Sequence, residues 1–253
     1  MNSYGQFCPV AKACELLCER WTMLVVRELV CGSRHFNDLR RGVPRMSPAL
    51  LTRRLRQLER NGIVRRLAQG RRGSAYELTH AGLELRPLVE SMGVWGHRWV
   101  RSDLRRRDLD AGLLMWDIRR SVQAGKFPAR RVVVEFAFRD APSGMGRWWL
   151  VSTEGGTDLC LQDPGYEVDV IVRSSVHALT AVWMRECSLQ QAQRNGAIEV
   201  LGPRELLQRL PVWLGGSSIA TMGAESLARD PAHPIRRSGL VAAAAAERAR
   251  ISA

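Results

Sequence analysis

Lysine is almost absent from this chain of 253 residues, since arginine supplies every basic residue except Lys12 and Lys126. Long hydrophobic runs are absent too, and no stretch reaches the roughly 18 apolar residues that a membrane-spanning helix requires. The first residues also lack the basic and then apolar order of a secretory signal. We therefore expect a cytoplasmic protein that has no membrane partner.

The sequence motifs of several enzyme classes are missing as well. There is no HExxH pair, no GxSxG nucleophile elbow and no glycine loop for phosphate, and the five histidines are scattered. Six cysteines occur in a chain that is 45% hydrophobic and needs no disulfide framework, so we expect reduced thiols. Cys14, Cys18 and Cys31 lie among apolar positions, which predicts core thiols, and no further metal ligands stand nearby. We expect neither an enzyme nor a bound metal or cofactor.

The positive charge is concentrated in the first half of the chain. Residues 1–110 hold 21 basic and 11 acidic side chains, whereas the whole chain holds 38 and 25 and carries a net charge of +13. A basic field over a small domain attracts polyanions, because each neutralised phosphate releases a condensed counterion. The alternative is that the charge serves only solubility. The length accommodates two domains of ordinary size.

Helical periodicity dominates the first 60 residues. Apolar spacing over residues 9–31 predicts two short helices that break near residues 18–21, and residues 36–41 form a third piece. A longer helix is expected from Ser47, because serine is a good N-cap, to just before Gly62. Its leucines share one stripe, and its arginines project from the opposite side. One face of this helix is therefore core and the other is strongly basic.

A hairpin and a long helix are expected next. Residues 63–67 and 75–78 are typical of short strands, and glycines flank the arginines at the tip of their link. Thr79 can cap a helix whose apolar residues continue to Trp95 and Trp99. These two indoles are four residues apart and share a face. We expect them to be buried against a second subunit.

The sequence motifs of the N-terminal half resemble those of a known family. Its motifs are Cys8-Pro9, Arg20-Trp21, Phe36-Asn37-Asp38-Leu39, Ser47-Pro48, Leu51-Thr52-Arg53-Arg54-Leu55, Leu58-Glu59, Asn61-Gly62, and Tyr76-Glu77-Leu78-Thr79 with Gly82. Over residues 6–103 they are similar to the HxlR-type bacterial transcription regulators, which are MarR-like. The resemblance implies a mainly α winged helix-turn-helix domain and a homodimer that binds near-palindromic, double-stranded operator DNA.

The helix from Ser47 and the hairpin tip are the expected DNA-binding surface. A helix in the major groove can present arginine forks to guanine edges and short side chains to thymine methyl groups. Arg53 and Arg56 are the expected base readers, and the alternative is that they are solvated arginines on an ordinary amphipathic helix. The expected contacts are Ser47, Pro48, Ala49, Thr52, Arg53 and Arg56 at the groove, Gln57 and Arg60 nearer the backbone, and Arg71 and Arg72 in the wing.

After the charge-dense residues 102–110, short β-rich runs separated by turn residues replace the helical pattern. These runs cover residues 132–138, 148–151, 159–161, 168–172 and 197–201. We expect the first four to be consecutive antiparallel strands. Helices are expected at residues 175–185, 189–194 and 203–210. The result is an α+β domain.

Residues 112–215 resemble the sterol-carrier-protein-2-like domain. The matching features are the strand run ending Cys160-Leu161, the segment Val168-Asp169-Val170-Ile171-Val172, the helix through Leu179 and Trp183, and Gly196-Ala197-Ile198-Glu199-Val200-Leu201-Gly202. That fold encloses an apolar cavity, so the resemblance implies a hydrophobic effector that shifts operator affinity. Candidate lining residues, each with plain core as its alternative, are Phe136, Phe138, Trp149, Leu179, Trp183 and Trp213.

The expected organisation is thus a multidomain chain, with a winged helix-turn-helix domain at 1–107, an effector domain at 111–216 and a flexible tail at 222–253.

Two other functions stay open. Some regulators of the family sense oxidants through a cysteine before proline, and Lys12 could stabilise a Cys8 thiolate. A third hypothesis is a lipid carrier whose basic half binds acidic partners non-specifically.

Overall fold

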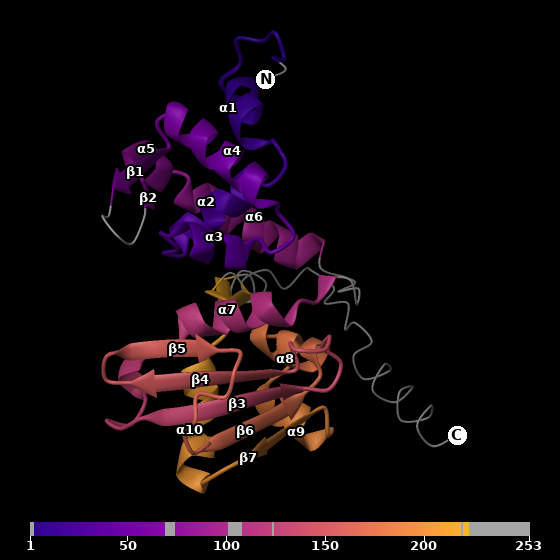
Figure 1. The fold of residues 1–253 in the computed structure, drawn as a ribbon. Helices are drawn as coiled ribbons and strands as arrows, with labels where there is room; N and C mark the ends of the chain where they lie inside the picture. The colour runs from indigo at the N-terminus through magenta and orange to yellow at the C-terminus, as the bar shows by residue number, and fades with distance from the viewer. Residues whose placement is uncertain (1–2, 69–73, 101–107, 123, 219, 223–253) are drawn as a thin grey trace. The chain divides into compact units, whose positions relative to one another are not determined.

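The computed structural model describes residues 3–68, 74–100, 108–122, 124–218 and 220–222 (Figure 1). The chain forms two compact units, Met1–Met92 and Gly93–Ala253. Their boundary lies inside one helix, whereas the sequence placed it in the charged segment beyond that helix. Arg71, Arg72 and the expected tail from residue 223 onward lie outside the described residues. No helix in the described ranges is long and apolar enough to cross a bilayer.

The first unit is a winged helix-turn-helix. Its elements are α1 (Pro9–Leu17), α2 (Thr22–Val30), α3 (Phe36–Gly42), α4 (Pro48–Arg60), β1 (Val64–Ala68), β2 (Ser74–Leu78), α5 (His80–Leu83) and α6 (Arg86–Trp99), the last of which runs past the boundary. The predicted break between the first two helices is confirmed, and Trp21 in it has a left-handed φ of 79°. The strands β1 and β2 pair antiparallel, as a wing requires.

The long helix expected from Thr79 is in fact two helices. The Thr79 hydroxyl accepts a hydrogen bond from the Gly82 amide at 3.2 Å, so the predicted cap is present, but α5 ends at Leu83. The next helix, α6, begins at Arg86 with Pro87 in its first turn. Proline has no N–H to continue a helix but is tolerated in a first turn, which explains why the pattern breaks here.

The core of the first unit lies between α2, α3 and α4. Val25 and Val26 of α2 are fully buried, and they join Leu39 of α3 and the leucines of α4 in one apolar cluster. These residues recur at three- and four-residue spacing, so each helix turns one stripe inward. The arrangement holds the second helix of the helix-turn-helix pair, α4, by its leucine side and leaves its other side to solvent.

The second unit is an α+β domain. Its elements are α7 (Ala111–Ser121), a short 3-10 helix (Ala124–Lys126), β3 (Val132–Phe138), β4 (Arg147–Thr153), β5 (Gly156–Cys160), β6 (Val170–Ser174), α8 (Val176–Trp183), α9 (Leu189–Arg194), β7 (Ile198–Leu201) and α10 (Arg204–Leu214). Asp110, whose carboxylate accepts from the Leu113 amide at 2.9 Å, caps α7. This helix was not anticipated, although Leu114, Met115 and Ile118 are its buried stripe.

The five strands form one sheet in the order β5-β4-β3-β6-β7. The expectation of four consecutive antiparallel strands is wrong at the fourth, because β6 pairs parallel with β3. The chain leaves β5, passes β4 and β3, and enters the sheet on the far side of β3. A parallel neighbour requires such a crossover rather than a tight turn. The residues 163–165 therefore belong to a crossover and not to a hairpin.

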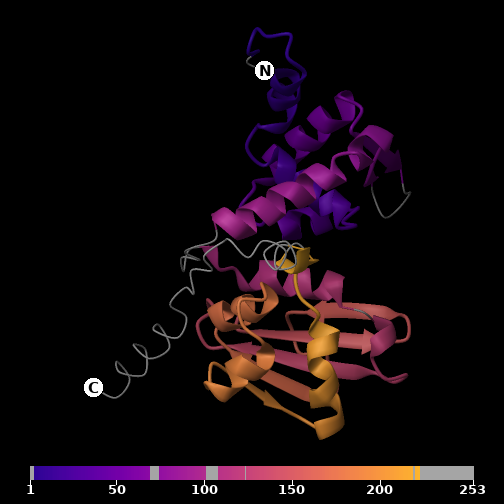
Figure 2. The same cartoon turned by 180° about the vertical axis from the view of Figure 1, so that it is seen from behind.

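The helices α8, α9 and α10 cover one face of the sheet, as the two opposite views show (Figures 1 and 2). The large apolar core lies on this side and includes Phe136 and Phe138 of β3 and Trp213 of α10. The other face carries a smaller apolar cluster that includes Val133 and Trp149. Alternation along the strands separates the two sets, because successive side chains point to opposite faces.

Candidate nucleic-acid interface

Helix α4 begins as the sequence predicts. The Ser47 side chain accepts a hydrogen bond from the Leu50 amide at 3.3 Å, and Pro48 occupies the first helical position. Leu51, Leu55 and Leu58 are almost fully buried, so the leucine side is fixed in the core. The rotation of the helix about its own axis is thereby set, and with it the direction of every other side chain.

The side of α4 away from the core is basic. Ser47, Pro48, Ala49, Arg53, Arg56 and Arg60 are exposed, and Thr52 is half-buried. Within the described parts of the chain, no carboxylate lies within ion-pair distance of Arg53, Arg56 or Arg60. Guanidinium groups without a carboxylate partner are available to bind an external anion. The free amide groups at the N-terminus of a helix also attract phosphate.

Gln57 does not belong to this surface. It is only 5% exposed, and its amide oxygen accepts a hydrogen bond from Arg54 Nη1 at 2.9 Å. Its amide nitrogen donates to Glu19 Oε1 at 3.3 Å. A side chain engaged in this way inside the fold does not reach a duplex, so the expectation that Gln57 lies near the DNA backbone is corrected.

Arg54 is a positioning residue that sequence reasoning missed. It is 8% exposed, forms an ion pair with Glu19, and its Nε donates to the Arg20 carbonyl oxygen at 3.2 Å. These contacts connect the middle of α4 to the segment between α1 and α2. The signal available in the sequence was its place beside the leucine stripe, three residues before Gln57.

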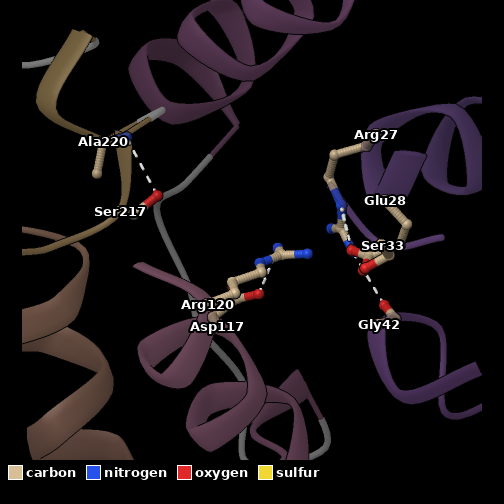
Figure 3. A network of polar contacts seen from close by, with 8 residues as sticks. All are labelled: Arg27, Glu28, Ser33, Gly42, Asp117, Arg120, Ser217 and Ala220. Atoms are coloured by element: carbon tan, nitrogen blue, oxygen red, sulfur yellow. Dashed lines mark hydrogen bonds and ion pairs between the residues drawn. The ribbon is translucent and has the colours of Figure 1, made fainter. Parts of the chain in front are cut away.

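A buried carboxylate holds α3 against α2 (Figure 3). Glu28 is fully buried, accepts from Arg27 Nη2 at 2.6 Å and accepts from the Ser33 hydroxyl at 3.2 Å. The same Arg27 nitrogen donates to the Gly42 carbonyl at 2.9 Å, at the end of α3. The charge of Glu28 is thus compensated by an arginine that also binds the last residue of the neighbouring helix. This network fixes where α3 ends and the turn into α4 begins.

The wing contributes further arginines at its base. Arg65 forms an ion pair with Glu77 across the hairpin, and Arg66 Nε donates to the Ser74 hydroxyl at 2.7 Å. Both arginines are exposed. Arg66 therefore adds positive charge on β1, whereas Glu77 compensates the charge of Arg65.

The cysteines near the N-terminus are placed differently from expectation. Cys18 and Cys31 are exposed and Cys14 is half-buried, so the prediction of three core thiols is wrong. The Cys18 thiol, by hydrogen bonding to Cys14, raises the pKa of the Cys14 thiol, and burial adds to this effect. Cys8 is half-buried at the N-cap of α1. Lys12, which was expected to support a Cys8 thiolate, instead binds Glu15 at 3.1 Å.

The candidate ligand-binding residues are all buried but do not form one group. Phe136, Phe138, Leu179, Trp183 and Trp213 share the core beneath the helices, whereas Trp149 lies on the opposite face of the sheet. A surface hollow of about 660 Å³ lies at one end of the sheet, and of the six candidates only Phe138 lines it. Its other lining residues include Arg139, Arg147 and Arg173.

Comparison with known proteins identifies the first unit. Residues 16–104 match the family described as HxlR-like helix-turn-helix. The HTH-type transcriptional regulator YvaP of Bacillus subtilis (strain 168) is 32% identical over 99 residues, which are 38% of this chain and 92% of the relative. The HTH-type transcriptional regulator sll1512 of Synechocystis sp. is 36% identical over 101 residues, which are 39% of this chain and 75% of the relative.

Solved structures match over the same extent of chain. The reduced form of the transcriptional regulator YodB from B. subtilis is 29% identical and covers 39% of this chain and 99% of its own, with a TM-score of 0.34. The redox regulator HypR in its oxidized form is 33% identical and covers 35% of this chain and 94% of its own, with a TM-score of 0.33.

Proposed function

Because this chain belongs to the HxlR-like helix-turn-helix family and is a transcriptional regulator, we propose that it binds operator DNA sequence-specifically, as a homodimer, through α4. The observation that carries the proposal is the exposed basic side of α4, on which Arg53 and Arg56 have no carboxylate partner among the described residues. Its leucine side is buried, so these arginines project outward from a rigid helix.

The geometry of α4 suits the major groove. Its first turn offers short side chains, Ser47, Pro48 and Ala49, which allow the helix to approach base edges closely. Arg53 and Arg56 follow one and two turns later on the same side, where guanidinium forks can pair with guanine. Arg60 lies nearer the helix end, in the position of a phosphate contact. The wing arginines Arg71 and Arg72 are assigned to phosphate or the adjacent minor groove.

Competition binding tests this proposal. An inverted repeat from the intergenic region beside the gene serves as the specific duplex, and a scrambled duplex of equal length and base composition serves as competitor. At physiological salt we expect the full chain to prefer the specific duplex by about a thousandfold or more. Equal affinity for the two duplexes would instead support a basic domain that binds acidic partners without discrimination.

Two apolar surfaces support the homodimer. Trp95 and Trp99 on α6 are 60% and 53% exposed, and they continue a line that contains Leu88 and Met92. Helix α1 has nine residues and buries none of them, although such a short helix is marginal in water by itself. Large exposed aromatic patches mark association sites, and a second copy of this chain carries the same patch. We therefore assign α1 and α6 to the dimer interface.

Replacing both indoles tests this assignment. The Trp95→Ser/Trp99→Ser variant is expected to raise the dimer dissociation constant by about a hundredfold or more, because buried aromatic anchors dominate association energetics. Sedimentation velocity over a concentration series measures the change. Leu201→Ser, which replaces an exposed apolar residue of β7, is the control and should sediment like the wild type. If the double variant has the same dimer dissociation constant as the wild type, Trp95 and Trp99 are not part of the interface.

We also propose that the second unit is a sterol-carrier-protein-2-like effector domain. Its support is the layer of helices over one sheet face, which encloses an apolar core containing five of the six candidate ligand residues. A hydrophobic ligand that binds one dimer arrangement more tightly than another would change operator affinity by the difference between its two binding free energies.

A redox switch at Cys8 has less support, because the Lys12 ammonium group is bound to Glu15.

A further inference from the structure

The hollow at the end of the sheet is built around a small residue. Ala137 near the end of β3 lies opposite Arg147 of β4 in the antiparallel register and opposite Arg173 of β6 in the parallel register. All three side chains therefore point to the sheet face opposite the one that α8, α9 and α10 cover. Arg139 lies in the bend just beyond β3. The methyl group of Ala137 leaves open space where three arginine side chains surround it, and all four residues line the hollow.

Backbone hydrogen bonds fix the main chain that carries these arginines. The Phe138 amide donates to the Gly146 carbonyl at 2.7 Å, and the Arg139 amide donates to the Ser174 carbonyl at 3.1 Å. The three strand ends are therefore joined immediately beside the hollow. Because neighbouring strands are spaced by a little under 5 Å, the Cα atoms of Arg147 and Arg173 lie roughly 10 Å apart. Two arginine side chains at that separation can reach one small group placed between them.

The charges around the hollow leave one arginine uncompensated. Arg173 Nη1 lies 3.1 Å from Glu199 Oε2, and Arg147 Nε lies 3.5 Å from Glu135 Oε1. Arg139 has no ion pair with any described carboxylate. The adjacent Asp140 does not supply one, because its carboxylate accepts the Val176 amide at 2.7 Å at the start of α8. Two of the three arginines thus face a carboxylate, and Arg139 supplies the net positive charge that an external anion can neutralise.

We propose that this hollow binds an oxyanion, the carboxylate or phosphate group of a small metabolite. A guanidinium group matches either oxyanion with two parallel N–H···O bonds, and several such groups around one hollow add charge to that geometry. A volume of about 660 Å³ holds a small organic molecule beyond its anionic group. The uncharged part of the wall comes from Ala137, Phe138, Ser174 and two glycines, and Glu199, the partner of Arg173, is the acidic residue of the lining. The site lies outside the apolar core beneath the helices and does not depend on the proposed operator binding.

The test measures anion binding to the full chain without DNA. The probes are inorganic phosphate, acetate and octanoate, each compared with sodium chloride at equal ionic strength, and the signal is the thermal unfolding temperature followed by titration calorimetry. Arg139→Gln and Arg147→Gln remove lining charges. Arg204→Gln is the matched control, since Arg204 is exposed at the start of α10 and does not line the hollow.

We expect at least one oxyanion probe to raise the unfolding temperature above the chloride value. Arg139→Gln and Arg147→Gln should each weaken binding of that probe by about tenfold, the scale of a charge-assisted hydrogen-bonded pair, while Arg204→Gln binds like the wild type. A shift with phosphate alone assigns the site to phosphate esters, and a larger shift with octanoate than with acetate assigns it to apolar carboxylates. The proposal is overturned if none of the three probes raises the unfolding temperature above the chloride value. It is also overturned if Arg204→Gln weakens binding of the probe as much as the two lining variants do.

Discussion

Replacing Arg53 or Arg56 with alanine is expected to lower affinity for the specific duplex by about tenfold to a hundredfold, because each arginine fork on a guanine contributes about 1–3 kcal/mol of discrimination. Both side chains are exposed on the side of α4 opposite the buried leucines. Their removal leaves the helix intact, since alanine is the best helix former. Affinity for the scrambled duplex should fall much less, so the specificity ratio narrows. Fluorescence anisotropy with both duplexes measures the two affinities.

Two control variants separate base reading from charge. Arg60→Ala, near the end of α4, is expected to weaken both duplexes alike and to reduce the slope of log affinity against log salt by about 0.9, the value for one phosphate contact. Arg204→Ala removes the same charge from the second unit and should leave both affinities unchanged. If Arg53→Ala and Arg56→Ala weaken the two duplexes to the same extent, neither residue reads bases.

The elements of the first unit could be predicted because their signals are local. Ser47 followed by Pro48 marks the start of α4, and its leucine stripe identifies the buried side. Local signals also gave a wrong prediction for Gln57, which was expected near the DNA backbone because it lies at the edge of the polar side in a helical projection. Its burial depends on Glu19 and Arg54, and Glu19 is distant in sequence. A contact between an N-terminal loop and the middle of α4 is a property of the folded unit.

The second unit shows the same division between local and distant information. The run Val132–Phe138 predicts a strand by its composition alone, and β3 has those bounds. Its parallel pairing with β6 depends instead on where the chain after Cys160 crosses the sheet. That crossover also decides which residues surround Ala137, because Arg173 becomes its neighbour only when β6 lies beside β3. The hollow could therefore not be predicted from the sequence, although the sequence contains each of its arginines, because their proximity depends on this strand order.

Gly42→Ala is expected to lower the free energy of unfolding of the first unit by about 3 kcal/mol, the scale of overpacking combined with disturbance of a buried ion pair. A methyl group at this position would overlap the carboxylate of Glu28. That carboxylate is fully buried and held by Arg27 and Ser33, so it has no free space to enter. Native-state hydrogen exchange of amides in α2 and α4 measures the loss in this unit alone.

A double-mutant cycle shows whether the clash with Glu28 is the cause. Glu28→Ala is itself destabilising, because Arg27 loses its carboxylate partner, but it empties the space that the new methyl group needs. In that background the added cost of Gly42→Ala should fall below about 1 kcal/mol, and a large coupling energy is the signature of two groups in contact. If the two losses simply add, the glycine is required for another reason. In that case the Arg27–Glu28 pair would not be what excludes a side chain from the end of α3.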